Sequence, residues 1–263
     1  PRLTEWLVEY NFNRPNQTIA KLNYMKLFGM VKGLNEQMSN PEARSLSFEE
    51  RLSLLVDREW EDREERRLVR LLKEAKLKVS ACLEDLDFSA ARGLDRSLIA
   101  SLSSFDWLEK HHHIIICGPT GVGKTYLCCA FGNGACRKGF RTQYLRVPKL
   151  LEELKISRAD GSYMRLIGKF SRLELLILDD WGLSSLSEAE AKDFLEVIEE
   201  CQGKCSIIIS SQLPIEHWHQ IISNPTVADA VLDRLIHAAY KFNLKGESMR
   251  KTYANPNAKS ATM

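Results

Sequence analysis

The stretch that decides the fold is IIICGPTGVGKT, residues Ile114–Thr125. Its second part has the pattern G-x-x-x-x-G-K-T, in which glycines let the backbone turn tightly and aim successive N–H groups at phosphate oxygens. In this pattern Lys124 reaches the β- and γ-phosphates, and the hydroxyl of Thr125 completes the coordination shell of Mg²⁺. The sequence therefore predicts a site for ATP and Mg²⁺. The residues expected to line it are Gly118, Pro119, Thr120, Gly121, Val122, Gly123, Lys124, Thr125 and Tyr126.

The residues on both sides of this loop support the same interpretation. The apolar run Ile114–Ile116 predicts a buried strand, and residues Tyr126–Cys136 predict a helix. The positive end of that helix would face the bound phosphates, because the N-terminus of a helix attracts anions. A glycine-rich turn with a surface lysine would not need this strand–loop–helix context.

A second motif follows at Leu175–Asp180, where four apolar residues precede two carboxylates. It predicts a core strand that places Asp179 to hold Mg²⁺ through water and Asp180 to polarise the attacking water. A later strand, Cys205–Ser211, ends in polar residues, and we expect Ser211 and Gln212 to sense the γ-phosphate. The alternative is a capped turn before Pro214.

The remaining pattern alternates strands and helices. Strands are predicted at Arg141–Val147 and Ala238–Leu244, and helices at Ser187–Glu200 and Thr226–His237. Pro148 opens a further helix, which breaks at residues 160–162 before another one. This order predicts an α/β fold with a five-stranded parallel sheet flanked by helices.

The first 80 residues read as a separate, all-helical domain. Apolar spacing predicts one helix over Gln17–Met38, and Ser47 with Glu50 forms a capping box at the start of a second. The charges of Arg58–Lys78 mix both signs, which favours a solvated helix surface over a nucleic-acid contact. We expect domains at residues 1–80 and 81–251, with residues 1–16 foreign or flexible and a disordered tail at 252–263.

Composition excludes some classes of protein. Hydrophobic residues make up 44% of the chain, and no apolar run approaches the roughly 20 residues that span a bilayer. No basic-then-apolar secretory signal precedes the first helix. The seven cysteines are an odd number without a C-x-x-C pair, which favours reduced thiols and argues against a metal site. The run His111–His113 reads as a strand entrance. We therefore expect a cytoplasmic protein with no membrane contact.

The distribution of charge is uneven, although the net charge is only +2. Eleven basic residues but three acidic ones lie between Lys124 and Arg172. Such an asymmetry predicts a face that binds a polyanion, unless acids elsewhere balance it in space. The residues expected to contact DNA are Arg158, Arg165, Lys169 and Arg172.

These motifs resemble the AAA+ ATPases, and most closely their IstB/DnaC-like branch. The resemblance rests on GPTGVGKT, on residues Asp160–Gly182, on SSQLPIEHW (Ser210–Trp218), and on Asp229–Lys251. It implies an ATPase that forms homo-oligomers with ATP at subunit junctions. Only about a dozen residues follow Arg250, so we expect no C-terminal lid, in contrast to most AAA+ proteins. It also implies binding to duplex DNA and the recruitment or stimulation of an integrase-like transposase.

The resemblance also implies roles for single residues. Arg234 falls where the family has an arginine finger that acts on a neighbouring subunit, and the alternative is a salt bridge with Asp229 or Asp233. Asp180 stands where many AAA+ proteins have Glu, which is one methylene longer. Arg250 is a candidate sensor of phosphate. Two other functions stay open, a helicase loader that binds single strands and a small-molecule kinase.

Overall fold

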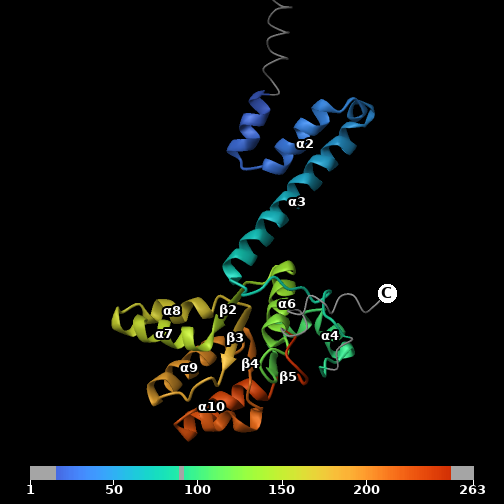
Figure 1. Ribbon diagram of the computed structural model, residues 1–263. Helices are drawn as coiled ribbons and strands as arrows, with labels where there is room; N and C mark the ends of the chain where they lie inside the picture. Colours follow the sequence, from blue (N-terminus) through green and yellow to red (C-terminus); the bar gives the residue numbers. More distant parts are fainter. Residues whose placement is uncertain (1–15, 89–91, 250–263) are drawn as a thin grey trace, which may run out of the picture. The chain divides into compact units, whose positions relative to one another are not determined.

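The computed structural model describes residues 16–88 and 92–249 (Figure 1). The predictions for residues 1–15, for Arg250 and for the tail concern residues outside this range. The prediction that no C-terminal lid follows also concerns residues outside it. The chain falls into two compact units that divide between Arg70 and Leu71, inside helix α3. The domain boundary at residue 80 stays a prediction.

The first unit is helical. Residues 16–24 form a helix, and the others are α2 (Phe28–Ser39), the 3₁₀ helix η1 (Pro41–Ser45) and α3 (Phe48–Ala75). The capping box is confirmed, because the Ser47 N–H donates to Glu50 Oε2 at 2.8 Å and the Glu50 N–H donates to Ser47 Oγ at 3.2 Å.

The prediction of one continuous helix from Gln17 to Met38 is wrong. The chain turns at residues 25–27, with Lys26 at φ 59°. The turn lets α2 approach α3 closely at Gly29, where a Cβ would lie 2.4 Å from the Arg58 carbonyl oxygen. The Gly29 N–H donates to the buried carboxylate of Glu59 at 2.8 Å. Close helix packing at a glycine therefore overrides the helical periodicity.

The charges of α3 pair with one another. Asp62 is buried and lies 2.6 Å from Lys32 Nζ and 2.7 Å from Arg66 Nε. Glu59 lies 2.6 Å from Arg63 Nε. The hydrogen bond from Lys32 above all, together with the charges of Lys32 and Arg66, holds the pKa of the Asp62 carboxyl below its usual value, although burial acts in the opposite direction. The mixed charges thus stabilise the helices of this unit.

The second unit contains a five-stranded sheet in the order β2-β3-β4-β1-β5, and all its pairings are parallel. The fold prediction is confirmed. The strands are β1 (His113–Cys117), β2 (Thr142–Arg146), β3 (Leu175–Trp181), β4 (Ser206–Ser211) and β5 (Ala239–Asn243). The helices are α4 (Arg96–Leu102), α5 (Asp106–Glu109), α6 (Lys124–Arg137), α7 (Val147–Ala159), α8 (Tyr163–Phe170), α9 (Glu188–Cys201), η2 (Ile215–Ile221) and α10 (Pro225–Ile236).

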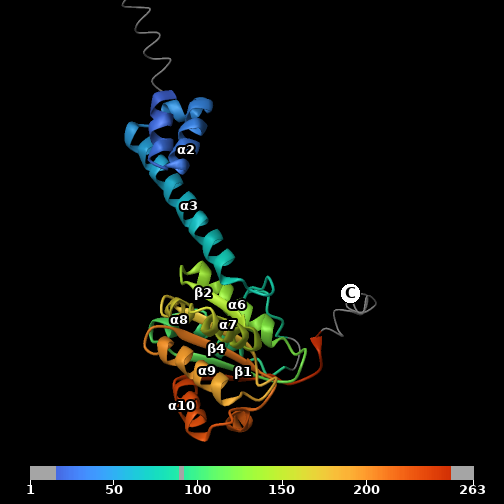
Figure 2. The same ribbon diagram turned by 90° about the vertical axis from the view of Figure 1, so that its left-hand side faces the viewer.

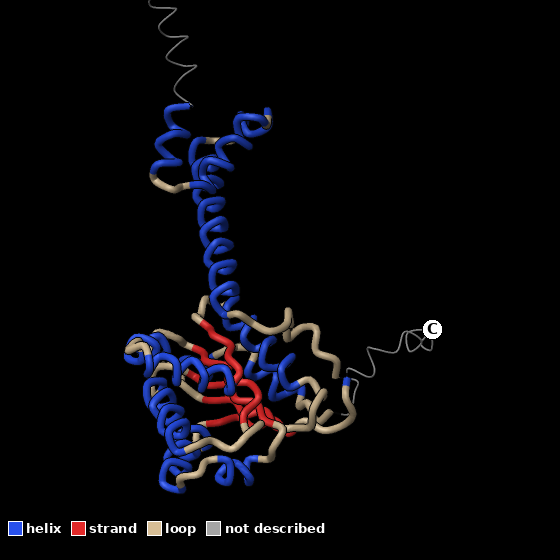
Figure 3. The backbone as a smooth tube through the Cα atoms, turned by 60° about the vertical axis from the view of Figure 1, so that its left-hand side comes forward, coloured by secondary structure: helices blue, strands red, loops and turns tan. Residues whose placement is uncertain are grey.

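Helices cover both faces of this sheet (Figures 1 and 3). Side chains alternate along a strand, so Ile115 packs on the side of α7, α8, α9 and α10, while Ile114 and Ile116 pack on the side of α6. Figure 2 shows α7 and α9 along the sheet from this side. Burial on both faces explains why the strands read as continuous apolar runs. Across the described residues, no helix is both long and apolar enough to cross a membrane.

Candidate functional site

The phosphate-binding loop joins β1 to α6, as the sequence predicted. Gly121 has φ 87°, and a Cβ there would lie 2.1 Å from Ser248 Oγ. Gly118 has φ 152°, and a Cβ there would lie 2.5 Å from the Leu244 carbonyl oxygen. The Met249 N–H donates to the Gly121 carbonyl at 2.9 Å. The loop is therefore held from outside by residues 244–249, and only glycine fits at these contacts.

Lys124 is the first residue of α6, and its side chain bends back across the loop. Its Nζ donates to the carbonyls of Gly118 at 2.6 Å and Pro119 at 2.9 Å. Burial lowers the pKa of this ammonium, although the carboxylates of Asp179 and Asp180 act in the opposite direction. A bound phosphate would offer the ammonium stronger acceptors than two carbonyls.

Asp179 is buried at the end of β3 and accepts several hydrogen bonds. Thr125 Oγ1 donates to it at 2.8 Å, the Tyr144 hydroxyl at 2.6 Å, and the Ser210 hydroxyl also donates. Burial alone would raise the pKa of Asp179, but these bonds outweigh it and keep the pKa below its usual value. The carboxylate is therefore charged at neutral pH.

The residues at this edge fit Mg²⁺. A hydroxyl (Thr125) and an ionised carboxylate (Asp179) lie together beside the phosphate-binding loop, and both are the hard oxygen ligands that this ion prefers. Tyr144 was missed by the sequence reasoning. Its signal was a phenol in an apolar strand, because a buried hydroxyl needs a partner.

Asp180 lies where the pairing of β3 with β4 breaks between Leu178 and Trp181. Its φ is 64°, an unfavourable conformation for a residue with a side chain. Its Oδ2 lies 2.6 Å from Nε of Arg146, at the end of the neighbouring strand β2. The structure thus brings Asp180 to the site and gives it a cationic partner that the sequence reasoning missed.

The two polar residues at the end of β4, Ser211 and Gln212, have different surroundings. Gln212 lies at the cavity and its Oε1 accepts a hydrogen bond from Thr120 Oγ1 at 2.7 Å. Ser211 is fully buried, and its hydroxyl donates to the Trp181 carbonyl at 2.9 Å and accepts from the Leu213 N–H at 3.0 Å. Gln212 is therefore placed to meet a phosphate, whereas Ser211 makes the contacts of a capped turn.

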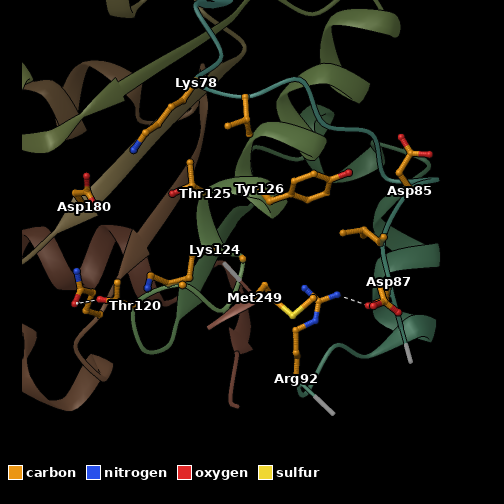
Figure 4. A pocket seen from close by; sticks show the side chains of 15 residues that line it. Lys78, Asp85, Asp87, Arg92, Thr120, Lys124, Thr125, Tyr126, Asp180 and Met249 are labelled. Carbon is orange, nitrogen blue, oxygen red and sulfur yellow. Dashed lines mark hydrogen bonds between the residues drawn. The ribbon is translucent and has the colours of Figure 1, made fainter. Parts of the chain in front are cut away.

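The phosphate-binding loop, Asp180 and Gln212 border a cavity of about 420 Å³ (Figure 4). Part of its wall comes from the segment between α3 and α4, which the sequence reasoning did not assign to the site. The lining residues are Lys78, Val79, Asp85, Leu86, Asp87, Arg92, Thr120, Gly121, Gly123, Lys124, Thr125, Tyr126, Asp180, Gln212 and Met249. The cavity is large enough for a nucleotide with its phosphates at Lys124.

Arg234 lies outside this cavity, on α10. Its Nη2 lies 2.9 Å from Glu199 Oε1 on α9, and its Nη1 donates to the Ala230 carbonyl at 2.8 Å. The salt bridge considered from the sequence, with Asp229 or Asp233, is replaced by one with Glu199. Asp229 and Asp233 instead contact His219 and His237.

The four basic residues of α7, α8 and the following turn differ in their contacts. Arg158 pairs with the buried Asp193 and lies over the ring of Tyr163 at 3.8 Å. Arg165 and Lys169 are exposed and line a shallow depression with Asp160. Arg172 is exposed as well. Three of the four head groups therefore face solvent without a carboxylate in salt-bridge contact among the described residues.

A five-stranded parallel sheet, with a P-loop after strand β1 and two adjacent acids near the end of β3, defines the ATP-binding P-loop fold of the AAA+ class. Residues 20–256 match the model of the IstB-like ATP binding proteins. The chain belongs to this family of insertion-sequence proteins.

Two relatives in bacteria support this assignment. The insertion sequence ATP-binding protein y4pL of Sinorhizobium fredii is 49% identical over 234 residues, which are 89% of this chain and 96% of the relative. The ATP-binding protein of insertion sequence IS1162 of Pseudomonas fluorescens is 50% identical over 198 residues, 75% of this chain and 86% of the relative.

Solved structures show the same fold. The chain is similar to DnaI with a TM-score of 0.55 and 21% identity, over 66% of this chain and 93% of the other. It is similar to the DnaC helicase loader with a TM-score of 0.54 and 19% identity, over 63% of this chain and 97% of the other. At these identities the likeness concerns the fold alone.

Proposed function

We propose that this ATP-binding protein hydrolyses ATP with Mg²⁺ and uses the ATP-bound state to assemble on duplex DNA as a transposition helper. The contact between Thr125 and Asp179 beside Lys124 carries the proposal for ATP and Mg²⁺. Bound Mg²⁺ would neutralise charge on the phosphates, and Thr125 and Asp179 would hold it. Asp180 would accept a proton from the attacking water.

The proposal for DNA rests on α7, α8 and the following turn, with Arg165, Lys169 and Arg172 exposed. Tyr163 and Phe170 are the aromatic residues of α8, and both are buried. Neither ring is therefore exposed to stack on the bases of a single strand, which favours contacts to the backbone of duplex DNA. The relatives named as insertion-sequence proteins support a transposase as partner, in the cytoplasm of a bacterium.

Oligomers would strengthen this binding. Subunits joined by ATP at their junctions would each present one basic patch, and linked patches bind with higher avidity than single ones. We therefore expect duplex binding with little sequence preference that tightens when ATP is present.

The test measures binding of duplex and single-stranded DNA at several salt concentrations, with and without ATP. Arg165→Glu and Lys169→Glu should each weaken duplex binding across sequences, with ATP binding retained. Each lost phosphate contact should reduce the logarithmic salt slope by about 0.9. Lys192→Glu, at an exposed lysine of α9 paired with Glu188, is the matched control. An ATP-independent preference for single strands would contradict the proposal and support the helicase loader.

A further inference from the structure

Arg92 is a buried cation in the wall of the nucleotide cavity. Its relative exposure is 8%. Its Nη1 lies 3.1 Å from the point that a Cβ on Gly123 would occupy, so the guanidinium borders the last residue before α6. Figure 4 shows Arg92 and Met249 at the same end of the cavity. The side chain therefore lies beside the phosphate-binding loop.

The position of Arg92 is fixed from two sides. Its Nη2 donates to the backbone carbonyl of Asp87, and its own carbonyl accepts from the Lys245 N–H at 2.9 Å. Arg92 thus links the segment before α4 to residues 244–249, which also hold the phosphate-binding loop through Met249. A side chain held in this way is preorganised and needs little reordering when a ligand binds.

Asp85 and Asp87 line the same cavity as Arg92, but the Arg92 guanidinium makes no salt bridge within residues 16–88 and 92–249. Among these residues its Nε is buried without a hydrogen-bond partner. A buried charge without a counter-charge destabilises a fold, and natural proteins keep such a group mainly where a ligand or partner compensates it. The compensating ligand must be an anion that reaches the cavity wall beside Gly123.

We propose that Arg92 binds the α- and β-phosphates of the nucleotide. The P-loop N–H groups hold the phosphates at the start of α6, beside the Arg92 guanidinium, and five N–H donors in a planar fork suit phosphate oxygens. Lys124 and Thr125 serve the β- and γ-phosphate end. Arg92 therefore binds the α- and β-phosphates, which ATP and ADP have in common. This inference rests on the nucleotide site but on neither hydrolysis nor DNA binding.

Arg92→Met tests the proposal in the full-length protein. Methionine has a long apolar side chain, so it fills similar space without a charge. The dissociation constants for ATP and for ADP should both rise at least about tenfold, as the loss of a hydrogen bond to a charged group implies. Arg92→Lys should recover part of the affinity, because it keeps the charge but not the fork. Arg96→Met, at an exposed arginine outside the cavity, should leave both constants unchanged.

Thermal unfolding separates a ligand-binding role from a structural one. Without nucleotide, Arg92→Met should melt at the wild-type temperature or above it, since an unpaired buried charge has been removed. The rise in melting temperature that wild type shows with ATP, ADP or inorganic pyrophosphate should shrink in the variant.

Four results would overturn the proposal, and three of them concern affinity for ATP and ADP or the melting temperature of the variant. They are unchanged affinity for ATP and ADP in Arg92→Met, a nucleotide-free variant that melts well below wild type, and a loss of affinity for ATP alone. A variant that loses the ATP effect but keeps the full pyrophosphate effect would also overturn it, because pyrophosphate has no base or ribose. Wild type that binds ATP without hydrolysing it would contradict the proposed function and leave this inference intact.

Discussion

At the scale of single residues, the two adjacent acids near the end of β3, Asp179 and Asp180, have different surroundings and therefore different roles. Asp179 accepts hydrogen bonds from three hydroxyl groups and is buried, which suits a fixed ligand for an ion. Asp180 is less buried and makes an ion pair with Arg146. The side-chain hydrogen bond to Asp180 and its charge raise the pKa of Arg146, so the guanidinium remains charged.

Asp180→Asn and Arg146→Ala should change hydrolysis in opposite directions. Asparagine cannot accept the proton of water, so ATP should still bind while turnover falls by about 100-fold or more. Arg146→Ala should raise turnover a few-fold, because the carboxylate of Asp180 is released from its ion pair. Steady-state ATP hydrolysis with a parallel binding titration checks both. Wild-type turnover in Asp180→Asn would show that another group polarises the water.

At the scale of elements, strand β1 shows how burial controls a titration. His113 starts the strand, where its Nδ1 accepts a hydrogen bond from the Ile207 N–H at 3.0 Å. Burial, assisted by the charges of His112 and His111, lowers the pKa of His113 to about 4. The unfolded chain therefore takes up a proton near pH 6.5, whereas the folded chain does so only near pH 4.

His113→Gln should reduce the sensitivity of the fold to acid. Between pH 6.5 and about 4, protons bind the unfolded chain preferentially, so wild type loses stability as the pH falls, on the order of 3 kcal/mol at most from this group. Denaturant unfolding at pH 7 and pH 4.5 should show a smaller loss for His113→Gln than for wild type. His217→Gln, at an exposed histidine, should follow wild type. Equal losses for all three proteins would mean that His113 titrates normally.

At the scale of the whole molecule, the nucleotide cavity of one chain contains Lys124 and Asp180 but not Arg234. In our proposal, Arg234 of one subunit acts on the nucleotide that is bound to a neighbouring subunit. In the single chain Arg234 pairs with Glu199. The two roles can be told apart, because a structural salt bridge requires both Arg234 and Glu199, whereas an arginine finger requires only Arg234.

Arg234→Ala should bind ATP, but its turnover should fall by at least about 10³-fold, as expected for the loss of an arginine finger. Glu199→Gln, the matched control, should keep most of its turnover. Mixing Arg234→Ala with Lys124→Ala should restore part of the activity, because each variant supplies what the other lacks at a shared junction. Equal losses in Arg234→Ala and Glu199→Gln, or no recovery at any mixing ratio, would favour the structural salt bridge.

The sequence alone determined the features that short-range chemistry encodes. A P-loop, an apolar strand that ends in two acids, and a capping box each lie within a dozen consecutive residues, and their spacing is the spacing that their hydrogen bonds require. The alternation of strands and helices then predicted the parallel sheet and its five strands.

Tertiary structure decided the contacts that join distant parts of the chain. Tyr144 reaches Asp179 and Arg146 reaches Asp180 because β2 pairs with β3 in one register, and a shift by one residue would turn both side chains to the other face. Arg92 borders Gly123 because an irregular segment follows the cavity wall, and no periodicity predicts the path of such a segment. These contacts depend on which elements become neighbours, a property of the packed chain rather than of any local pattern.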